Sequence, residues 1–248
     1  MLPLLDLRNV SKRYRDMVVI PELTVAVETG DFVGVIGPNG AGKTTLFGLI
    51  SGNLNCDGGQ ILFDGQDITH LSADARCRIG IGRTFQIPQP FEGMTVFENA
   101  LVAATFGAGL RGRSAELRAH EALSRCGLDR FGDVPAGRLA LLQRKRLELS
   151  RALATEPRLL LLDEVAGGLT DAEVGELVEL VSEIHRTGVT VLWIEHLVHA
   201  LVSAADRMLV LAEGRLLGDG GPKTVLNSRE VRDVYLGSDL DEGRDVKH

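Results

Sequence analysis

The chain has 248 residues, of which 44% are hydrophobic and 25% charged, a composition typical of a globular protein with a substantial core. Its formal net charge of -7 gives no support to a nucleic-acid partner, and its 3 separated cysteines argue against a disulfide or zinc framework. No apolar run reaches the roughly 18 residues of a membrane span, and the N-terminus lacks the basic-then-apolar layout of a secretion signal. A role at a membrane would therefore require a partner protein.

The N-terminal region alternates short apolar runs with turn residues. Residues 4–10 ("LLDLRNV") and 23–37 ("LTVAVETGDFVGVIG") predict early strands, with Gly30 and Asp31 in a turn. Residues 58–68 ("GGQILFDGQDI") predict a further hairpin segment. Because such runs alternate with helical patterns along the rest of the chain, the sequence predicts an α/β protein.

A phosphate-binding loop is predicted where "GPNGAGKT" fits G-x-x-x-x-G-K-[ST] at every fixed position. An apolar strand pattern precedes it and a helix that ends at Gly52 follows it, which disfavours a chance match in a glycine-rich turn. Glycines let the backbone wrap a phosphate closely, and the helix N-terminus adds the positive end of its dipole. Lys43 is expected to reach the β- and γ-phosphates of a nucleotide, and the Thr44 hydroxyl to ligate Mg²⁺. The residues expected to contact the nucleotide phosphates are Gly37, Pro38, Asn39, Gly40, Ala41, Gly42, Lys43, Thr44 and Thr45.

Residues 94–154 differ in composition from the rest of the chain. They have few β-branched runs and many Ala, Leu, Arg and Glu residues, which predicts a helical subdomain inserted in the α/β core. Residues 1–93 and 155–236 then form the core, and residues 237–248 are expected to be a flexible tail. The last helix of the insertion begins without a capping side chain, and its basic run at residues 144–146 is expected to be a solvated face.

An acidic pair follows the apolar strand pattern "RLLLL". Asp163 is predicted to end this strand and Glu164 to follow it, at the edge where α/β folds bind ligands. Alone, such a pair is most often a solvated strand end. Beside a complete phosphate-binding loop, Asp163 is expected to hold Mg²⁺, and Glu164 to polarise the water that attacks the γ-phosphate.

The strongest helix pattern of the chain comes after this acidic pair. Thr170 and Glu173 form a capping box at its start, and Gly188 stops it. Two more strands are predicted at residues 189–196 ("VTVLWIEH") and 207–214 ("RMLVLAEG"). The apolar stripe of the helix is predicted to consist of Val174, Leu177, Val178, Val181 and Ile184.

With these motifs in this order, nearly the whole chain resembles the ATP-binding-cassette (ABC) ATPases. Gln86 resembles the family's Q-loop glutamine, which senses Mg²⁺ and water and contacts the membrane subunit, and His196 resembles the switch histidine that touches the γ-phosphate. Asp171 lies at the acidic position of the D-loop. Tyr14 lies where the family has the aromatic that stacks on adenine, although a strand-end aromatic also commonly packs on a core. The resemblance implies a P-loop NTPase fold with an antiparallel β subdomain and an inserted α-helical subdomain, and an ATPase that uses ATP and Mg²⁺.

Two segments resemble one branch of this family, the branched-chain amino-acid-type uptake ATPases. They are residues 80–103 ("GIGRTFQIPQPFEGMTVFENALVA") and 229–237 ("REVRDVYLG"). The resemblance implies an importer in which two related ATPase subunits dock on two membrane permeases near the Q-loop, fed by an extracytoplasmic substrate-binding protein. The chain would then lie at the cytoplasmic face of a bacterial inner membrane, held there by the permeases.

The resemblance breaks at the family's signature motif, L-S-G-G-Q. The residues at its five positions are Leu139, Ala140, Leu141, Leu142 and Gln143. Leu142 stands at the second glycine, where the backbone approaches the γ-phosphate bound by the other subunit of the closed dimer, so a bulky side chain is expected to weaken that shared site. Val165, in place of the usual proline after the acidic pair, is a milder departure. We therefore expect an asymmetric heterodimer with one competent and one weakened ATP site, and a homodimer is the alternative that the resemblance leaves open.

Three alternatives stand beside a transport ATPase. The departure in the signature motif favours a regulatory or structural subunit that binds nucleotide and hydrolyses little, whereas the intact Glu164 argues against it. Soluble relatives that act on ribosomes or DNA usually carry two cassettes, long coiled-coil insertions or zinc motifs, which this sequence lacks. An exporter would use the same ATPase machinery, although residues 80–103, which contain the Q-loop glutamine, and residues 229–237 favour uptake. The cargo stays open, because an ATPase does not contact it.

Overall fold

The computed structural model describes residues 2–233 and divides into two compact units. Among the described residues, the first unit comprises residues 2–70 and 193–233, and the second unit comprises residues 71–192. The helical segment expected at residues 94–154 lies inside the second unit, which also holds part of the expected core. The expected tail and the last residues of "REVRDVYLG" lie outside the described residues.

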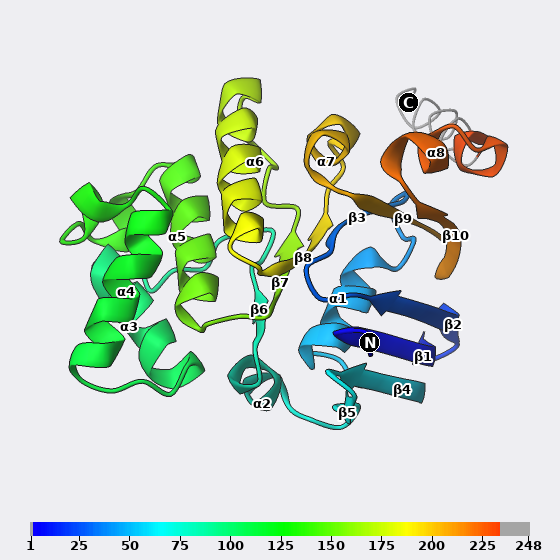
Figure 1. Ribbon diagram of the computed structural model, residues 1–248, viewed down its shortest axis with the longest axis horizontal. Helices are drawn as coiled ribbons and strands as arrows, with labels where there is room; N and C mark the ends of the chain where they lie inside the picture. Colours follow the sequence, from blue (N-terminus) through cyan, green and yellow to red (C-terminus); the bar gives the residue numbers. More distant parts are fainter. Residues whose placement is uncertain (1, 234–248) are drawn as a thin grey trace. The chain divides into compact units, whose positions relative to one another are not determined.

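The first unit contains an antiparallel sheet with the strand order β2-β1-β4-β5. Its strands are β1 (Leu5–Tyr14), β2 (Met17–Val27), β4 (Gly58–Phe63) and β5 (Gln66–Asp67) (Figure 1). Leu5, Leu7 and Val10 of β1 are buried, and Arg8 between them is exposed, so one face of the strand contributes to the core. The predicted early strands and hairpin are confirmed, and β1 and β2 are longer than expected.

The second sheet portion of the first unit joins the phosphate-loop strand to the C-terminal strands. Strand β3 (Phe32–Ile36) pairs in parallel with β9 (Arg207–Ala212), which pairs antiparallel with β10 (Arg215–Gly220). All five residues of β3 are buried, as expected for a strand covered on both faces. The helices of this unit are α1 (Lys43–Ser51), α7 (Val198–Ala204) and α8 (Pro222–Leu226).

The second unit contains the parallel strand pair that carries the acidic residues. Strand β6 (Ile81–Arg83) pairs with β7 (Leu159–Asp163), with Arg83 opposite Leu161. All five residues of β7 are buried, which confirms the strand predicted from "LLLL". Strand β8 (Thr190–Ile194) spans the boundary and carries the chain back into the first unit.

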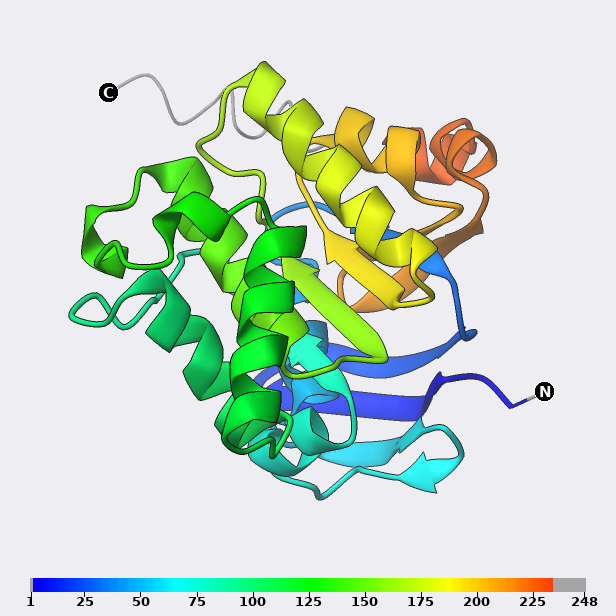
Figure 2. The ribbon, with the colours of Figure 1, turned by 60° about the vertical axis from the view of Figure 1, so that its left-hand side comes forward.

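The rest of the second unit is mainly helical, as the composition of residues 94–154 predicts. Its helices are α2 (Ala73–Arg78), α3 (Val96–Val102), the π-helical turn η1 (Ala103–Gly107), α4 (Arg113–Arg125), the 3₁₀ turns η2 (Asp129–Phe131) and η3 (Ala136–Arg138), α5 (Leu141–Ala154) and α6 (Asp171–Arg186). Helices α3, α4 and α5 lie side by side (Figures 1 and 2). The expected α/β class with an antiparallel sheet, a parallel sheet and a helical segment is therefore confirmed.

Helix α6 shows how closely local pattern predicts local structure. The Thr170 hydroxyl accepts the Glu173 backbone N–H, and the Glu173 carboxylate accepts the Thr170 backbone N–H, which is the predicted capping box. The buried stripe contains Leu180, which the predicted stripe lacked, whereas Val178 is only half-buried. Leu180 belongs there because it follows Leu177 by three residues, nearly one helical turn.

Within residues 2–233, none of the helices combines the length and the apolar character that crossing a membrane requires.

Candidate functional site

The phosphate-binding loop follows β3 directly and its backbone is closely packed at Gly37. A Cβ atom on Gly37 would lie 2.2 Å from the Leu211 carbonyl oxygen, so a larger residue does not fit there. Gly42 has φ of 96°, in the left-handed region that glycine adopts without strain, and it forms the N-cap of α1. Asn39 and Gly40, at the tip of the loop, are exposed. The loop therefore has the open, glycine-dependent backbone that a phosphate cradle requires.

Lys43 is the first residue of α1 and folds back over the loop. It is 5% exposed, and its Nζ donates to the carbonyl oxygens of Gly37 (2.7 Å) and Pro38 (3.1 Å). The first turn of α1 contains no acidic residue, and no side chain of the described residues caps it. Its N–H groups and dipole therefore face the loop without a competing anion, which suits a bound phosphate. Thr44 is exposed and Thr45 half-buried in this same turn.

Tyr14 ends β1 and does not pack in the core, because its side chain is 43% exposed. The Lys12 ammonium lies 5.6 Å from the centroid of the Tyr14 ring. Asp57 ties this strand end to its neighbour, since its carboxylate accepts the Arg13 backbone N–H at 2.6 Å and contacts Lys12 Nζ at 3.2 Å. The Arg13 N–H, and then Lys12, lower the pKa of Asp57. An exposed aromatic face beside an anchored strand end suits a stacked base.

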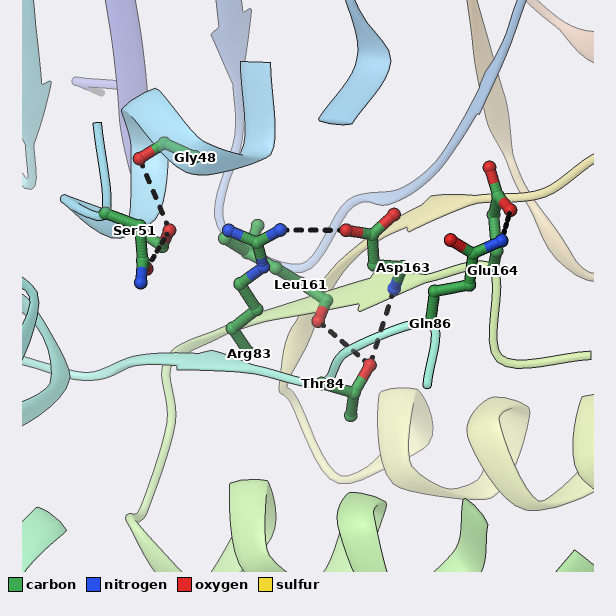
Figure 3. Close-up of polar contacts among 9 residues, drawn as sticks. Gly48, Ser51, Arg83, Thr84, Gln86, Leu161, Asp163 and Glu164 are labelled. Atoms are coloured by element: carbon green, nitrogen blue, oxygen red, sulfur yellow. Dashed lines mark hydrogen bonds and ion pairs between the residues drawn. The ribbon is translucent and has the colours of Figure 1, made fainter. Parts of the chain in front are cut away.

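Asp163 is held by an ion pair that the sequence motifs did not predict. Its Oδ2 lies 2.8 Å from Nη2 of Arg83, and the two side chains are only 5% and 10% exposed (Figure 3). The Thr84 N–H donates to the Leu161 carbonyl at 2.9 Å, and its hydroxyl lies 3.4 Å from the Asp163 backbone N–H. The ends of β6 and β7 are thus joined by backbone and side chain at the same point. The signal that identifies Arg83 is a cation inside the otherwise apolar run "IGIGRTF".

Glu164 follows Asp163 with an unusual backbone conformation. Its φ is 49°, a left-handed value that non-glycine residues adopt only when the surrounding structure enforces it. Gln86 Nε2 donates to Glu164 Oε2 at 2.5 Å (Figure 3). Two predicted site residues that lie 78 positions apart are therefore in direct contact.

A cavity of about 400 Å³ opens beside this contact. The residues that line it are Gln86, Ile87, Pro88, Leu141, Lys145, Glu164, Gly167 and Gly168. Lys145 brings a cation to this wall, and its Nζ lies 3.5 Å from the Gln86 carbonyl oxygen. The cavity thus joins the Q-loop, the expected hydrolytic carboxylate and the first turns of α5.

The expectation that residues 144–146 form a solvated helix face is wrong. Lys145 is 4% exposed, and Arg146 pairs with Glu176 of α6 at 2.6 Å. Arg144 turns back and donates to carbonyl oxygens of the preceding turn at 2.7 and 2.9 Å. These cations lie at the N-terminal end of a helix, where the dipole disfavours them, so partners outside the helix compensate.

The start of α5 is uncapped, as predicted, but a different leucine faces outward. Ala140 is the N-cap and no side chain of the described residues caps the helix there. Leu142 is 8% exposed, whereas Leu141 is 42% exposed and lies against Gly168. Successive helix positions point about 100° apart, so only one of the two leucines lies outward. Leu142, the residue expected to weaken the shared site, is therefore buried, and the leucine exposed at this helix start is Leu141.

Arg151 of helix α5 contacts the segment that follows Gln86, at Gln89 and Phe91. Arg151 Nη1 donates to the Gln89 carbonyl oxygen at 2.9 Å and to Glu148 at 2.8 Å, and its guanidinium lies 5.0 Å from the centroid of the Phe91 ring. Burial raises the pKa of the Glu148 carboxyl, an effect that the charge of Arg151 opposes. The helix and the loop are consequently fastened to each other at a partly buried charged contact.

His196 lies in the first unit and is exposed at the exit of β8. The preceding residue, Glu195, is 2% exposed, and its carboxylate accepts the Trp193 Nε1–H at 3.1 Å. The Glu195 backbone N–H donates to Val35 of β3 at 3.4 Å. This contact sets the strand exit that carries His196 beside the strand exit that leads into the phosphate-binding loop.

The predicted residues thus fall into two groups. Tyr14, the phosphate-binding loop and His196 belong to the first unit, and Gln86, Asp163, Glu164, Asp171 and the signature segment belong to the second. Asp171 is the first residue of α6 and is exposed, Gln143 is half-buried, and Val165 is 5% exposed.

The residues at the end of β7 fit a Mg²⁺ ion. Asp163, Glu164 and Gln86 offer oxygen atoms, which Mg²⁺ prefers over nitrogen or sulfur. Within residues 2–233, His, Cys, Asp and Glu side chains do not gather in threes as a metal site of their own. Mg²⁺ usually binds one or two carboxylates together with substrate phosphates and water.

A phosphate loop that leads from a buried strand into a helix, together with a second buried strand that ends in two carboxylates, defines a P-loop nucleotide-binding protein. A profile described as "ABC transporter" matches residues 20–167, and the chain belongs to this family as an ATP-binding subunit with ATPase activity. It is 36% identical to the high-affinity branched-chain amino acid transport ATP-binding protein BraF of Pseudomonas aeruginosa, over 95% of this chain and 98% of that protein. It is 32% identical to the lipopolysaccharide export system ATP-binding protein LptB of Escherichia coli, with the same coverage. The crystal structure of the ADP conformation of MJ1267, an ATP-binding cassette of an ABC transporter, matches with a TM-score of 0.86 and 30% identity, over 96% of this chain and 100% of that one.

Proposed function

We propose that this chain is the ATP-hydrolysing subunit of an ABC importer for branched-chain amino acids or a related small polar solute. The observation that supports hydrolysis best is the contact between Gln86 and Glu164 at the end of a buried strand, in a chain with a complete phosphate-binding loop.

The proposed roles follow the chemistry of the side chains. Lys43 and the N–H groups of the loop bind the nucleotide phosphates, and the exposed ring of Tyr14 stacks on adenine. Glu164 orients and polarises the attacking water, and His196 contacts the γ-phosphate. Thr44, Gln86 and Asp163 would hold Mg²⁺, which neutralises charge that develops on the phosphates.

Exposed apolar side chains around the Q-loop support a permease partner. Phe85, Ile87 and Phe91 are 43%, 72% and 45% exposed, and Phe106 of η1 is 73% exposed. A cavity of about 160 Å³ opens beside Phe85, and its lining also includes Ala103 of η1 and Arg151 of α5. Exposed apolar surface beside a cavity that is lined by charged side chains suits binding of a segment of another protein. We assign it to the two permeases, which would hold the chain at the cytoplasmic face of a bacterial inner membrane and receive cargo from an extracytoplasmic binding protein.

The second ATPase subunit of the dimer is proposed to carry the intact signature motif. The exposed Leu141 replaces the first glycine of that motif, so its side chain stands where a nucleotide phosphate of the other subunit would approach. The ATP bound by this chain's own phosphate-binding loop meets the partner's signature motif instead. One site of the heterodimer is therefore competent, and the other is weakened.

The second candidate is a nucleotide-binding regulatory subunit with little hydrolysis, which the leucines at the start of α5 favour. Single-turnover hydrolysis of radiolabelled ATP by the complex, purified with its permeases, separates the two functions. Hydrolysis that stops when Glu164→Gln is introduced in this chain supports the ATPase. Unchanged hydrolysis in that variant supports the regulatory subunit.

The direction and the cargo are tested with the same complex in proteoliposomes. Stimulation of ATP hydrolysis and uptake by a binding protein loaded with leucine, isoleucine or valine supports the proposal. Release of lipopolysaccharide from the membrane, without response to amino acids, would favour export instead. This alternative is included because relatives of both kinds have similar identities to this chain.

A further inference from the structure

The buried ion pair between Arg83 and Asp163 is not explained by the roles above. The guanidinium and the carboxylate meet at 2.8 Å, with side chains 10% and 5% exposed. Arginine keeps its positive charge at any physiological pH, so Asp163 has a permanent cation beside it. The proposed Mg²⁺ role would place a second cation at this same carboxylate.

Two cations cannot both gain the full attraction of one carboxylate oxygen. A charge pair shielded from water is strongly coupled, and removing one partner leaves a buried charge without compensation. A metal that approaches Asp163 must therefore displace Arg83 from Oδ2 or share the carboxylate with a like charge. Either outcome costs free energy, which phosphate oxygens of a bound nucleotide can offset.

Arg83 is also connected along the chain to the contact at Glu164. It is the last residue of β6, and Gln86 follows it by three positions. Its guanidinium lies 5.0 Å from the centroid of the Phe85 ring, whose side chain is 43% exposed on the proposed permease-facing surface. Arg83 and the Q-loop glutamine therefore belong to the same short segment of the chain (Figure 3).

We propose that Arg83 is a positioning residue that serves as the resident counter-cation of Asp163. It pairs with the carboxylate, competes with metal for it, and leaves Oδ2 when metal and nucleotide bind together. Its departure is passed to Phe85 and Gln86. The inference rests on the proposed role of Asp163 as a metal carboxylate.

The test measures Mn²⁺ binding to the full-length chain by electron paramagnetic resonance, with and without a non-hydrolysable ATP analogue. Arg83→Gln should tighten Mn²⁺ binding to the nucleotide-free chain on the order of tenfold, because a competing charge is gone. Arg125→Gln is the matched control, since Arg125 pairs with Glu121 on the exposed face of α4. The double variant Arg83→Gln, Asp163→Asn should lose the gain. Binding by Arg83→Gln within about twofold of wild type would overturn the inference, because the resident charge would then not compete.

A measurement on the wild-type chain covers the case in which Arg83→Gln fails to fold. The side-chain nitrogen resonances of Arg83, assigned in ¹⁵N-arginine-labelled protein, should shift when Mg²⁺ and the analogue are added together and not when the analogue is added with EDTA. Equal shifts under both conditions would contradict the inference. The single variant Asp163→Asn separates the proposed metal role of Asp163 from the inference about Arg83. If nucleotide binding by this variant still depends on metal, the metal role of Asp163 fails and the inference fails with it. The metal role of Asp163 stands if Asp163→Asn loses this dependence. The inference alone then fails if Arg83→Gln binds Mn²⁺ like wild type and the Arg83 resonances shift equally with Mg²⁺ and with EDTA.

Discussion

The two leucines at the start of α5 should respond very differently to replacement by glycine. Leu142→Gly restores the second glycine of the signature motif, so the motif alone predicts faster turnover or no loss of turnover for this variant. In the structure Leu142 is 8% exposed and Leu141 is 42% exposed. Leu142→Gly therefore removes a core side chain, whereas Leu141→Gly opens the helix start at little structural cost.

The free energies follow from burial and backbone preference. Truncating a buried leucine to alanine costs about 2–3 kcal/mol at a site near the core edge. Changing alanine to glycine in a helix costs up to about 1 kcal/mol more, so the total for Leu142→Gly is about 3–4 kcal/mol. Leu141→Gly loses about half of a leucine's burial, or about 1 kcal/mol. For a chain of this size, 1 kcal/mol shifts Tm by roughly 2–4 °C, so Leu142→Gly should lower Tm by roughly 6–16 °C and Leu141→Gly by roughly 2–4 °C.

Thermal unfolding monitored by circular dichroism measures the stability difference, and ATP hydrolysis by the assembled transporter measures the effect on the site that is proposed to be weakened. We expect Leu141→Gly to raise turnover while the chain stays nearly as stable as wild type. Equal losses of Tm in the two variants would refute the packing of Leu142. A loss of turnover in a stable Leu141→Gly variant would refute the argument that this side chain obstructs a phosphate.

Three further predictions concern stability. Trp193→Phe removes the indole N–H that the buried Glu195 carboxylate accepts, and it should lower the free energy of unfolding, measured in urea, by about 1–3 kcal/mol. The double variant Trp193→Phe, Glu195→Gln should lower it by less, and an equal loss would contradict this. Thr170→Ala removes the capping hydroxyl of α6 and should lower the free energy of unfolding by about 1 kcal/mol, and no change would mean that the cap contributes nothing. Burial raises the pKa of Glu148 in the folded state, so its contribution is present below the unfolded pKa and is lost as pH rises through the folded pKa. The free energy of unfolding of wild type relative to Glu148→Gln should therefore fall as pH rises above the ordinary glutamate pKa of about 4.3. A rise would show that the pair with its arginine dominates.

The features that sequence predicted well depend on short-range patterns. The capping box at Thr170 needs only the residues within one helical turn, and the strand before Asp163 needs only a run of apolar residues. The phosphate-binding loop combines a fixed spacing with both flanking elements. Each of these can be recognised without knowing what packs against it.

The features that sequence missed depend on contacts between distant segments. Arg83 meets a carboxylate 80 positions away, and Lys145 is buried against the Q-loop, where a basic run suggested a solvated face. The choice between Leu141 and Leu142 required the position at which α5 begins, because a shift of one residue turns a side chain by about 100°. Aligning the signature motif by residue type does not show where the helix begins, so it does not predict which of the two leucines is exposed.

The central claim, that this chain hydrolyses ATP with Glu164, is tested most directly by separating nucleotide binding from hydrolysis in one variant. Glu164→Gln keeps the shape of the side chain and a hydrogen-bonding partner for Gln86, and it removes the carboxylate that polarises water. We predict that the variant binds Mg²⁺–ATP with wild-type affinity in a fluorescence titration and that phosphate release from the assembled transporter falls by a factor on the order of 100 or more. Phosphate release at the wild-type rate, with nucleotide binding intact, would contradict the account.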